Sequence, residues 1–196
     1  MLKVSELGNG LLHDIHFSVD AGQCVSLSGP SGSGKTSLLR ALADLDDHHG
    51  QIAWQGQAQN SMPAHEWRRR IAYLPAESAW WFDHVSEHFE IFESKWLQAL
   101  NLREALQGAL VSEVSSGERQ RLALLRLISR GPEVLLLDEP TANLDEQTRD
   151  LVEQFVENYR IEQQAAVIWV GHDAQQLKRV ATRHLIIDNN TVSERV

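Results

Sequence analysis

The stretch "GPSGSGKTS", which begins at Gly29, constrains this chain more than any other feature. It fits the pattern G-x-x-x-x-G-K-[S/T], follows the apolar run "CVSLS" and precedes leucines at helical spacing. Glycines let the backbone curl so that several N–H groups point inward, and the start of a helix adds partial positive charge. The sequence therefore predicts a strand, a phosphate-binding loop and a helix over residues 35–45.

We expect the whole loop to contact the phosphates of a bound nucleotide. Lys35 can reach the β- and γ-phosphates, and the Thr36 hydroxyl can bind Mg²⁺. A flexible glycine loop in front of a helix is the alternative, but the spacing and the flanking elements both favour a nucleotide. The predicted loop residues are Gly29, Pro30, Ser31, Gly32, Ser33, Gly34, Lys35, Thr36 and Ser37.

A second motif is acidic. "EVLLLDEP" is a near-continuous apolar run, typical of a buried parallel strand, that ends in two carboxylates. Asp138 at the end of such a strand suits Mg²⁺ through its water shell. Glu139 could orient or deprotonate an attacking water. A solvated acidic strand end is the alternative. Beside a phosphate loop, the carboxylates are better explained as part of the same site.

The alternation of strands and helices predicts an α/β fold with a mostly parallel sheet. "LKVSEL", "DIHFSV" and a small hairpin around Gly56 add strands near the start. The stretch 84–130 has a mostly helical pattern, a helix is expected over 146–162, and "HLIIDNNTVSE" predicts a hairpin with an Asn-Asn turn. A chain of 196 residues fits one domain.

Composition excludes several classes of protein. The formal net charge of −9 argues against nucleic-acid binding, which relies on Lys and Arg to neutralise phosphates. Cys24 is the single cysteine, so the sequence has no internal disulfide. No signal-peptide core and no apolar run of about 20 residues is present. We therefore expect a cytoplasmic chain, and any membrane spans would belong to another protein.

The segment "VSSGERQR" combines an N-cap signal with an apolar-periodic helix. The head of such a helix offers free N–H groups to an anion. On its spacing alone, a simple capped helix is an equally good interpretation.

The order of these motifs, followed by "LLLDEPTANLD" and "VGHD", resembles the nucleotide-binding subunits of ABC transporters over roughly residues 2–190. The family's signature sequence is Leu-Ser-Gly-Gly-Gln/Glu, and Val114 and Ser116 are the two departures from it here. The resemblance implies a P-loop NTPase core, an antiparallel β subdomain and a helical subdomain at about 78–130. It also implies ATP and Mg²⁺ as cofactors.

The resemblance assigns roles to individual residues. Two subunits close head to tail around two ATP molecules, so that the signature of one subunit meets the γ-phosphate held by the other's Lys35. Glu139 would be the catalytic base, His172 would touch the γ-phosphate and the attacking water, and Asp145 would lie at the dimer contact. The signature residues implied to bind nucleotide are Ser115, Ser116, Gly117 and Glu118.

The function implied is an ATPase that powers an integral-membrane permease from the inner face of the membrane. The compact length and "AAVIWVGHD" are most similar to small bacterial ATPases of iron or metal export, with haem export as a second option. The alternatives are a soluble ABC-type ATPase of repair or translation and a phosphate-binding regulator without turnover. Coiled-coil arms or basic surfaces would indicate the soluble ATPases, and neither is visible in the sequence.

Two positions depart from the family pattern. The region around Leu7 has no aromatic residue to stack on adenine, so an aliphatic side chain would supply that contact. Ala76 stands where the family has a glutamine that reaches Mg²⁺ or the attacking water. We expect Glu77 to serve as the oxygen ligand instead, after a one-residue shift of the loop. The alternative is that no side chain makes this contact.

Three further stretches require interpretation. Trp80, Trp81 and Phe82 are expected to line a docking groove for the permease, unless they only cover the helical subdomain. "HVSEH", from His84, matches an inverted zinc-protease pattern without a third ligand, so zinc catalysis is disfavoured. "DLDDHHG", from Asp44, is better explained as a polar turn than as a metal cluster.

Overall fold

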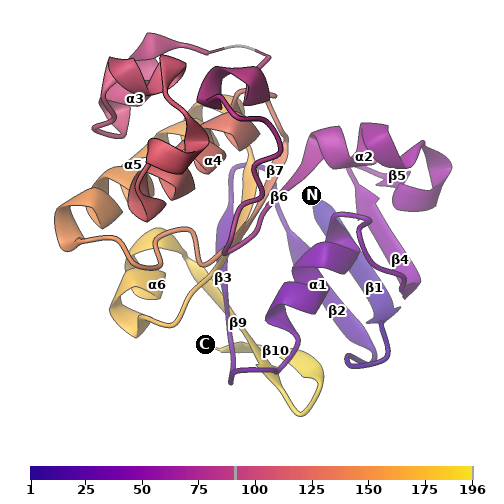
Figure 1. The fold of residues 1–196 in the computed structure, drawn as a ribbon. Helices are drawn as coiled ribbons and strands as arrows, with labels where there is room; N and C mark the ends of the chain where they lie inside the picture. Colours follow the sequence, from indigo (N-terminus) through magenta and orange to yellow (C-terminus); the bar gives the residue numbers. More distant parts are fainter. Residues whose placement is uncertain (91, 196) are drawn as a thin grey trace.

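The structure is a computed structural model and describes residues 1–90 and 92–195 (Figure 1). Its central sheet has the strand order β10-β9-β3-β8-β7-β6, and all neighbours pair in parallel except β9 and β10. This mostly parallel sheet confirms the predicted α/β fold. Its strands are β3 (Cys24–Ser28), β6 (Ile71–Leu74), β7 (Val134–Asp138), β8 (Ala166–Val170), β9 (Arg183–Asp188) and β10 (Thr191–Arg195).

A second sheet is antiparallel and has the order β2-β1-β4-β5. Its strands are β1 (Leu2–Gly8), β2 (Ile15–Val19), β4 (His49–Trp54) and β5 (Gln57–Ala58). The predicted final hairpin is also present. Asn189 and Asn190 both adopt positive φ angles, 49° and 63°, which a two-residue turn between twisted strands requires.

The helices are α1 (Lys35–Leu42), α2 (Ala64–Arg70), α3 (Ser94–Ala99), α4 (Ser116–Ile128), α5 (Glu146–Gln163) and α6 (Ala174–Val180). Helix α1 ends three residues earlier than expected because Asp44 turns to a positive φ of 58° and the Leu45 N–H bonds back to the Arg40 carbonyl. Helix α5 begins at its N-cap Asp145, which accepts the Thr148 N–H at 2.9 Å. No helix among the described residues is long and apolar enough to cross a bilayer.

The stretch 84–130 is less regular than its sequence pattern predicts. Besides α3 and α4 it contains three short 3₁₀ turns, at Val85–His88, Glu104–Gly108 and Val111–Glu113. Asn101, with a φ of 49°, ends α3 after six residues. Leucines of this stretch are buried from successive short turns, and Leu100 and Leu106 lie in one core cluster. Burial therefore requires apolar spacing but not a continuous helix.

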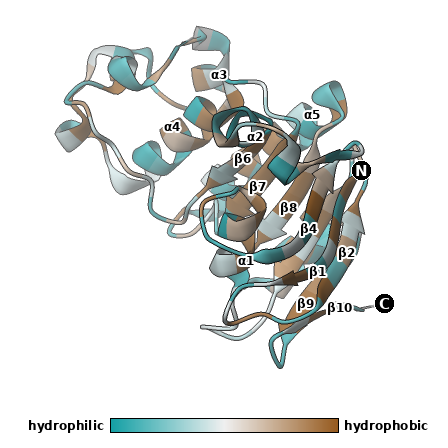
Figure 2. Cartoon of the chain, turned by 90° about the vertical axis from the view of Figure 1, so that its right-hand side faces the viewer, coloured by the Kyte–Doolittle hydropathy of each residue, from teal (hydrophilic) through white to brown (hydrophobic). Residues whose placement is uncertain are grey.

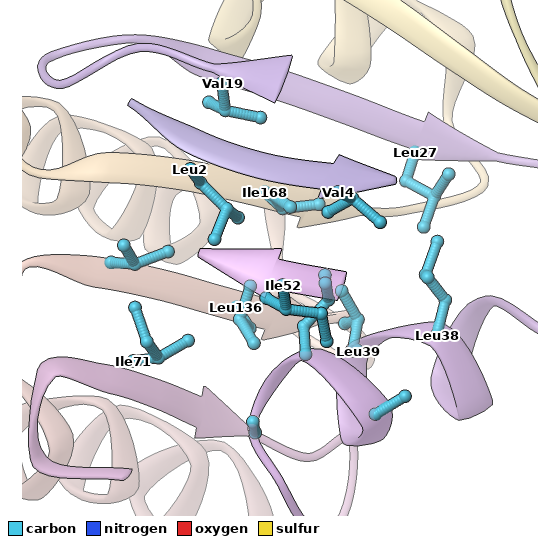
Figure 3. Close-up of a cluster of buried hydrophobic side chains, with 14 of the residues drawn as sticks. Leu2, Val4, Val19, Leu27, Leu38, Leu39, Ile52, Ile71, Leu136 and Ile168 are labelled. Carbon is cyan, nitrogen blue, oxygen red and sulfur yellow. The ribbon is translucent and has the colours of Figure 1, made fainter. Parts of the chain in front are cut away.

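Two apolar clusters lie on opposite faces of the central sheet. On one face Leu136 of β7 and Ile168 of β8 pack with Leu39 of α1 and with the antiparallel sheet (Figure 3). On the other face Leu137 and Trp169 pack against α4, α5 and α6. Because β7 and β8 are buried on both faces, they are continuously apolar, as the brown strands in Figure 2 show.

Candidate functional site

The carboxyl ends of adjacent parallel strands bring the predicted site residues to one edge of the sheet. The phosphate loop follows β3, His172 follows β8, and Asp138 and Glu139 stand at the end of β7. These three strands are direct neighbours in the order β3-β8-β7. In an open parallel sheet this edge is where ligands bind.

The phosphate loop is a tight backbone arch. Gly29, Gly32 and Gly34 have φ angles of 152°, 76° and 103°. A Cβ atom on Gly29 would lie 2.7 Å from the Ile187 carbonyl oxygen, so the first position has no room for a side chain. Helix α1 starts at Gly34 without a side-chain cap and without an acidic residue in its first turn. Its N–H groups and dipole therefore suit an anion.

Lys35 lies across this loop and is almost fully buried, with 7% of its surface exposed. Its Nζ donates to the carbonyl oxygens of Gly29 and Pro30, both at 2.9 Å. These two bonds hold the ammonium group of Lys35 against the loop, within reach of a phosphate that the loop would bind.

Asp138 is buried and accepts two hydroxyl hydrogen bonds on Oδ2. The Thr36 hydroxyl donates at 2.7 Å and the Tyr73 hydroxyl at 3.1 Å. Burial raises the pKa of Tyr73 and the neighbouring Asp138 charge raises it further, so the phenol stays neutral and remains a donor. Tyr73 was not identified from the sequence. The register brings it there: Tyr73 of β6 pairs in parallel with Leu136 of β7, two residues before Asp138.

The carboxylate and hydroxyl oxygens of Asp138 and Thr36 are hard ligands, the chemistry that Mg²⁺ prefers. The residues present therefore fit the predicted cofactor. They would hold it between the end of β7 and the first turn of α1.

Glu139 has a positive φ of 50°, which is unusual for a residue with a side chain. Two backbone bonds hold it there: its N–H donates to Val170 O at 3.1 Å, and its carbonyl accepts the Ala142 N–H at 3.1 Å. Its Oε1 lies 2.8 Å from His172 Nε2. The imidazole is more exposed than the carboxylate, at 58% against 33%, so the pair opens to solvent on the histidine side.

The predicted signature residues form the head of α4. Ser115 is the N-cap: its Oγ accepts the Glu118 N–H at 3.3 Å, and its own N–H donates to Glu118 Oε2 at 3.1 Å. Partial burial would raise the pKa of Glu118, but hydrogen bonds from Ser115 and Arg103 outweigh it and lower the pKa. Ser115 and Ser116 are exposed, and a Cβ on Gly117 would lie 3.2 Å from Leu144.

Two residues that sequence reasoning did not single out border the phosphate loop. Asn9 donates to Ser37 Oγ at 2.7 Å and ties the end of β1 to α1. Leu11 is 39% exposed, and its Cδ2 lies 3.2 Å from the position of a Cβ on Gly34. An exposed aliphatic side chain therefore stands beside the loop, in a region whose sequence has no aromatic residue.

The loop after β6 places Ala76 and Glu77 at the surface. Glu77 lines a cleft together with Gln120 and Asn143, and within the described part of the chain this cleft does not include Thr36 or Asp138. Glu77 is exposed on this surface, next to Ala76. Its role as a ligand stays a prediction.

The three consecutive aromatics divide between core and surface. Trp80 packs against the cluster around α4, whereas Trp81 and Phe82 are 58% and 49% exposed. His88 is buried and organises them: its Nε2 accepts the N–H of Trp81 at 2.9 Å and that of Phe82 at 3.1 Å. Its Nδ1 lies 3.0 Å from the His84 carbonyl, so the proton must be on Nδ1.

Both candidate metal motifs lie within the described residues. In residues 1–90 and 92–195 no group of three or more His, Cys, Asp or Glu side chains is arranged to hold a metal. In "DLDDHHG", Asp46 pairs with Arg40 at 2.7 Å and His48 contacts Gln59 at 2.8 Å. The stretch is a turn held by ordinary polar contacts.

Comparison with known proteins shows the family to which the chain belongs. The sequence profile described as "ABC transporter" matches residues 12–142. The chain belongs to the ABC transporter family. It is an ATP-binding cassette ATPase of that family, as the motif order predicts.

Two curated relatives show the range of the family. The chain is 30% identical over 181 residues to the "Probable iron export ATP-binding protein FetA" of Escherichia coli (strain K12), covering 85% of this chain and 80% of FetA. It is 29% identical over 210 residues to the "Sulfate/thiosulfate import ATP-binding protein CysA" of Yersinia pestis. That match covers 94% of this chain but only 55% of CysA.

Solved structures share the fold. The ATP binding subunit of an ABC transporter matches with a TM-score of 0.90 and 22% identity, covering all of this chain and 90% of its own. A bacterial ABC transporter cassette solved as a dimer matches with a TM-score of 0.82 and 21% identity, covering all of this chain and 98% of its own. At these identities the structures confirm the ABC ATPase fold.

Proposed function

We propose that this chain hydrolyses ATP in a head-to-tail dimer and thereby drives a membrane transporter. The observation that carries the proposal is the Glu139–His172 contact of 2.8 Å at the ends of β7 and β8, beside the phosphate loop. A carboxylate oriented by an imidazole at this edge suits a base for an attacking water. When bound, Mg²⁺ would neutralise charge on the β- and γ-phosphates.

Each remaining group has a distinct task in this proposal. Lys35 and the N–H groups at the start of α1 bind the phosphates, because Lys35 lies across the loop and the helix start has no side-chain cap. Thr36 and Asp138 hold Mg²⁺, and Tyr73 keeps the Asp138 carboxylate in place. Leu11 supplies an apolar contact to the adenine ring of ATP.

The signature helix head belongs to the partner's nucleotide in this scheme. Ser115 and Ser116 are exposed at the start of α4, whereas the phosphate loop precedes α1 on the other face of the central sheet. A second copy could present its own α4 head to the open side of the Glu139–His172 pair. A bacterial cassette with the same fold is dimeric, which supports the pairing of two copies.

The test is a dimer trap. Glu139→Gln keeps the size of the side chain but removes the base, so hydrolysis should slow by about 10²–10⁴-fold while ATP still binds. Size-exclusion chromatography with ATP and Mg²⁺ should then show a dimer that the unaltered chain does not accumulate. Glu162→Gln, an exposed change near the end of α5, is the control and should behave like the unaltered chain. A Glu139→Gln chain that stays monomeric, or that hydrolyses ATP normally, would count against the proposal.

The permease is proposed to dock beside Trp81. A groove there is lined by exposed Leu45 and Trp81 and by Arg68, Arg69, Arg126 and Arg130. Arg126 stacks between Trp80 and Trp81, 4.6 and 4.8 Å from the two ring centres. An apolar segment that carries carboxylates, on the cytoplasmic side of an integral-membrane permease, would complement this groove.

A binding assay with a co-expressed integral-membrane permease tests this docking. Trp81→Ala should weaken association by about 30-fold, the equivalent of roughly 2 kcal/mol for an aromatic hot spot. Ile161→Ala, at an equally exposed apolar residue on α5, is the matched control and should leave binding unchanged. Equal binding by both variants would place the interface elsewhere.

The cargo is proposed to be iron or another metal ion, moved outward. The support is the similarity to FetA, which spans most of both chains. A strain that lacks this chain should retain more cellular iron after a metal load. Unchanged metal content, together with loss of sulfate uptake, would favour import.

A further inference from the structure

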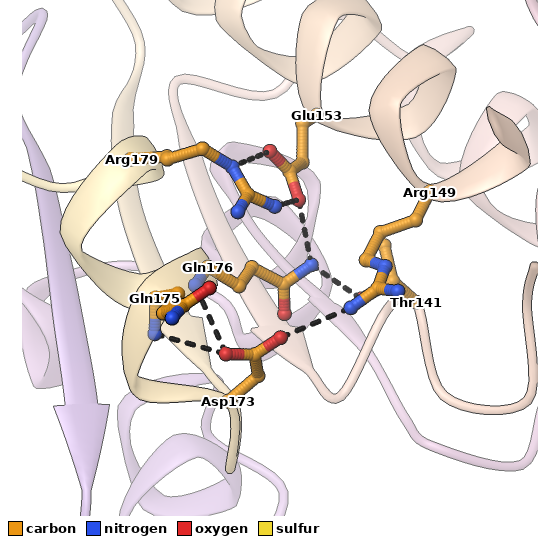
Figure 4. Close-up of polar contacts among 7 residues, drawn as sticks. All are labelled: Thr141, Arg149, Glu153, Asp173, Gln175, Gln176 and Arg179. Atoms are coloured by element: carbon orange, nitrogen blue, oxygen red, sulfur yellow. Dashed lines mark hydrogen bonds and ion pairs between the residues drawn. The ribbon is translucent and has the colours of Figure 1, made fainter. Parts of the chain in front are cut away.

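Gln176 of α6 joins the two segments that carry the proposed catalytic pair. It is buried, with 4% of its surface exposed. Its Nε2 donates to Thr141 Oγ1 and to Glu153 Oε1, both at 2.8 Å (Figure 4). Thr141 follows Glu139 by two residues, so the bond fastens the turn after Glu139 to the helix that follows His172.

The orientation of this amide is fixed by its partners. A carboxylate only accepts hydrogen bonds, so the nitrogen and not the oxygen of Gln176 must face Glu153. Glu153 is itself held by Arg179 through two bonds, of 3.2 and 2.9 Å. Both N–H groups of the amide are thus committed, one to each neighbour, and the amide cannot rotate without losing both.

The same helix supports the backbone next to His172. Asp173 caps α6, accepting the N–H groups of Gln175 at 2.9 Å and Gln176 at 3.3 Å, and it pairs with Arg149 of α5 at 3.0 Å (Figure 4). A Cβ on Gly171 would lie 3.1 Å from Leu177 Cδ2, so α6 packs directly against the residue before His172. Movement of α6 would therefore move His172.

We infer that Gln176 is a positioning residue that keeps Glu139 and His172 within hydrogen-bonding distance by holding the Thr141 turn against α6. This inference rests on the proposed roles of that pair. It assigns the side chain an effect on turnover and not on nucleotide binding, because Gln176 touches neither the phosphate loop nor α1 in the described contacts.

Steady-state ATPase kinetics with isosteric variants test the inference. Gln176→Met keeps the length of the side chain but removes both donors, and we expect kcat to fall about tenfold, within the ~10²-fold range for a displacement near 1 Å. The KM for ATP should stay the same. Thr141→Val removes the other end of the bond and should give the same loss. The double variant should be no slower than either single variant, because both substitutions break the same Gln176–Thr141 hydrogen bond.

Gln175→Met is the matched control, since Gln175 is the exposed neighbour on the same helix and should keep full activity. A merely structural role predicts losses that multiply in the double variant, or a raised KM. Any of these, or a Gln176→Met kcat equal to that of the control, would overturn the inference. If Gln176→Met does not fold, Thr141→Val alone decides it by the same kcat-against-KM comparison.

Glu139→Gln distinguishes a wrong catalytic site from a wrong positioning role for Gln176. If it retains normal turnover, the proposed site is wrong and so is the inference. If it is inactive while Gln176→Met and Thr141→Val are fully active, only the positioning role fails.

Discussion

The loop that presents Trp81 and Phe82 depends on a single buried imidazole, which leads to a quantitative prediction. His88 makes three hydrogen bonds: two accepted from backbone N–H groups and one donated to the His84 carbonyl. His88→Phe keeps an aromatic ring among the neighbouring aromatics but removes all three bonds. At about 1 kcal/mol for each bond, the free energy of unfolding should fall by about 3 kcal/mol.

Urea denaturation followed by tryptophan fluorescence measures this loss, and a thermal melt should drop by about 6–12 °C for a chain of this size. His88→Gln retains one acceptor oxygen and should lose about half as much. Hydrogen exchange should show faster exchange of the Trp81 and Phe82 amides in His88→Phe, because these groups lose their acceptor.

His84→Ala is the control within the same "HVSEH" stretch. His84 is exposed, so its side chain should contribute less than about 0.5 kcal/mol. The reasoning fails if His88→Phe is as stable as the unaltered chain, or if both histidine variants are destabilised equally.

Three further predictions concern single side chains. Lys35→Ala should weaken ATP binding by at least about tenfold in calorimetry, since charge-assisted bonds to phosphate are worth about 1.5–3 kcal/mol each. If Glu77 replaces the glutamine, Glu77→Ala should cut ATPase activity and raise the Mg²⁺ requirement while Ala76→Gln changes little; a silent Glu77→Ala together with an Ala76→Gln that raises turnover would show that the site lacks this ligand. Burial raises the pKa of Cys24 to about 12, so at pH 8 only about 10⁻⁴ of it is thiolate. Maleimide should label it only after denaturation, and rapid labelling of the folded chain would refute its burial.

The backbone of the site could be predicted from the sequence because local patterns specify it. The glycine arch, the apolar strand before Asp138 and the N-cap at Ser115 each arise from a few consecutive residues. Once the strands are parallel neighbours, their carboxyl ends must meet at one edge. The ABC ATPase fold followed from the order of these motifs and is confirmed.

The side-chain relays could not be predicted, because they join residues far apart in the sequence. Tyr73 reaches Asp138 across 65 positions, and Gln176 reaches Thr141 across 35. A tyrosine in a strand or a glutamine in a helix has no local signature for such a bond. The stretch 84–130 is mostly helical, as expected, but its division into short turns was missed for a related reason: residues such as Asn101 decide where a helix ends.

Net charge also describes this molecule less well than the local arrangement of its charges. The sum of −9 argues against a polyanion as partner. Yet the groove beside Trp81 is lined by four arginines and by no acidic side chain among the described residues. At physiological salt, charges act over about 8 Å, so a docking segment would sense these arginines more than the distant carboxylates. Two of them, Arg68 and Arg130, make only long ion pairs, of 3.7 and 3.9 Å, which a closer carboxylate could replace. A partner that carries both carboxylates and an apolar side chain would therefore bind in this groove, although the net charge of the whole chain would repel it.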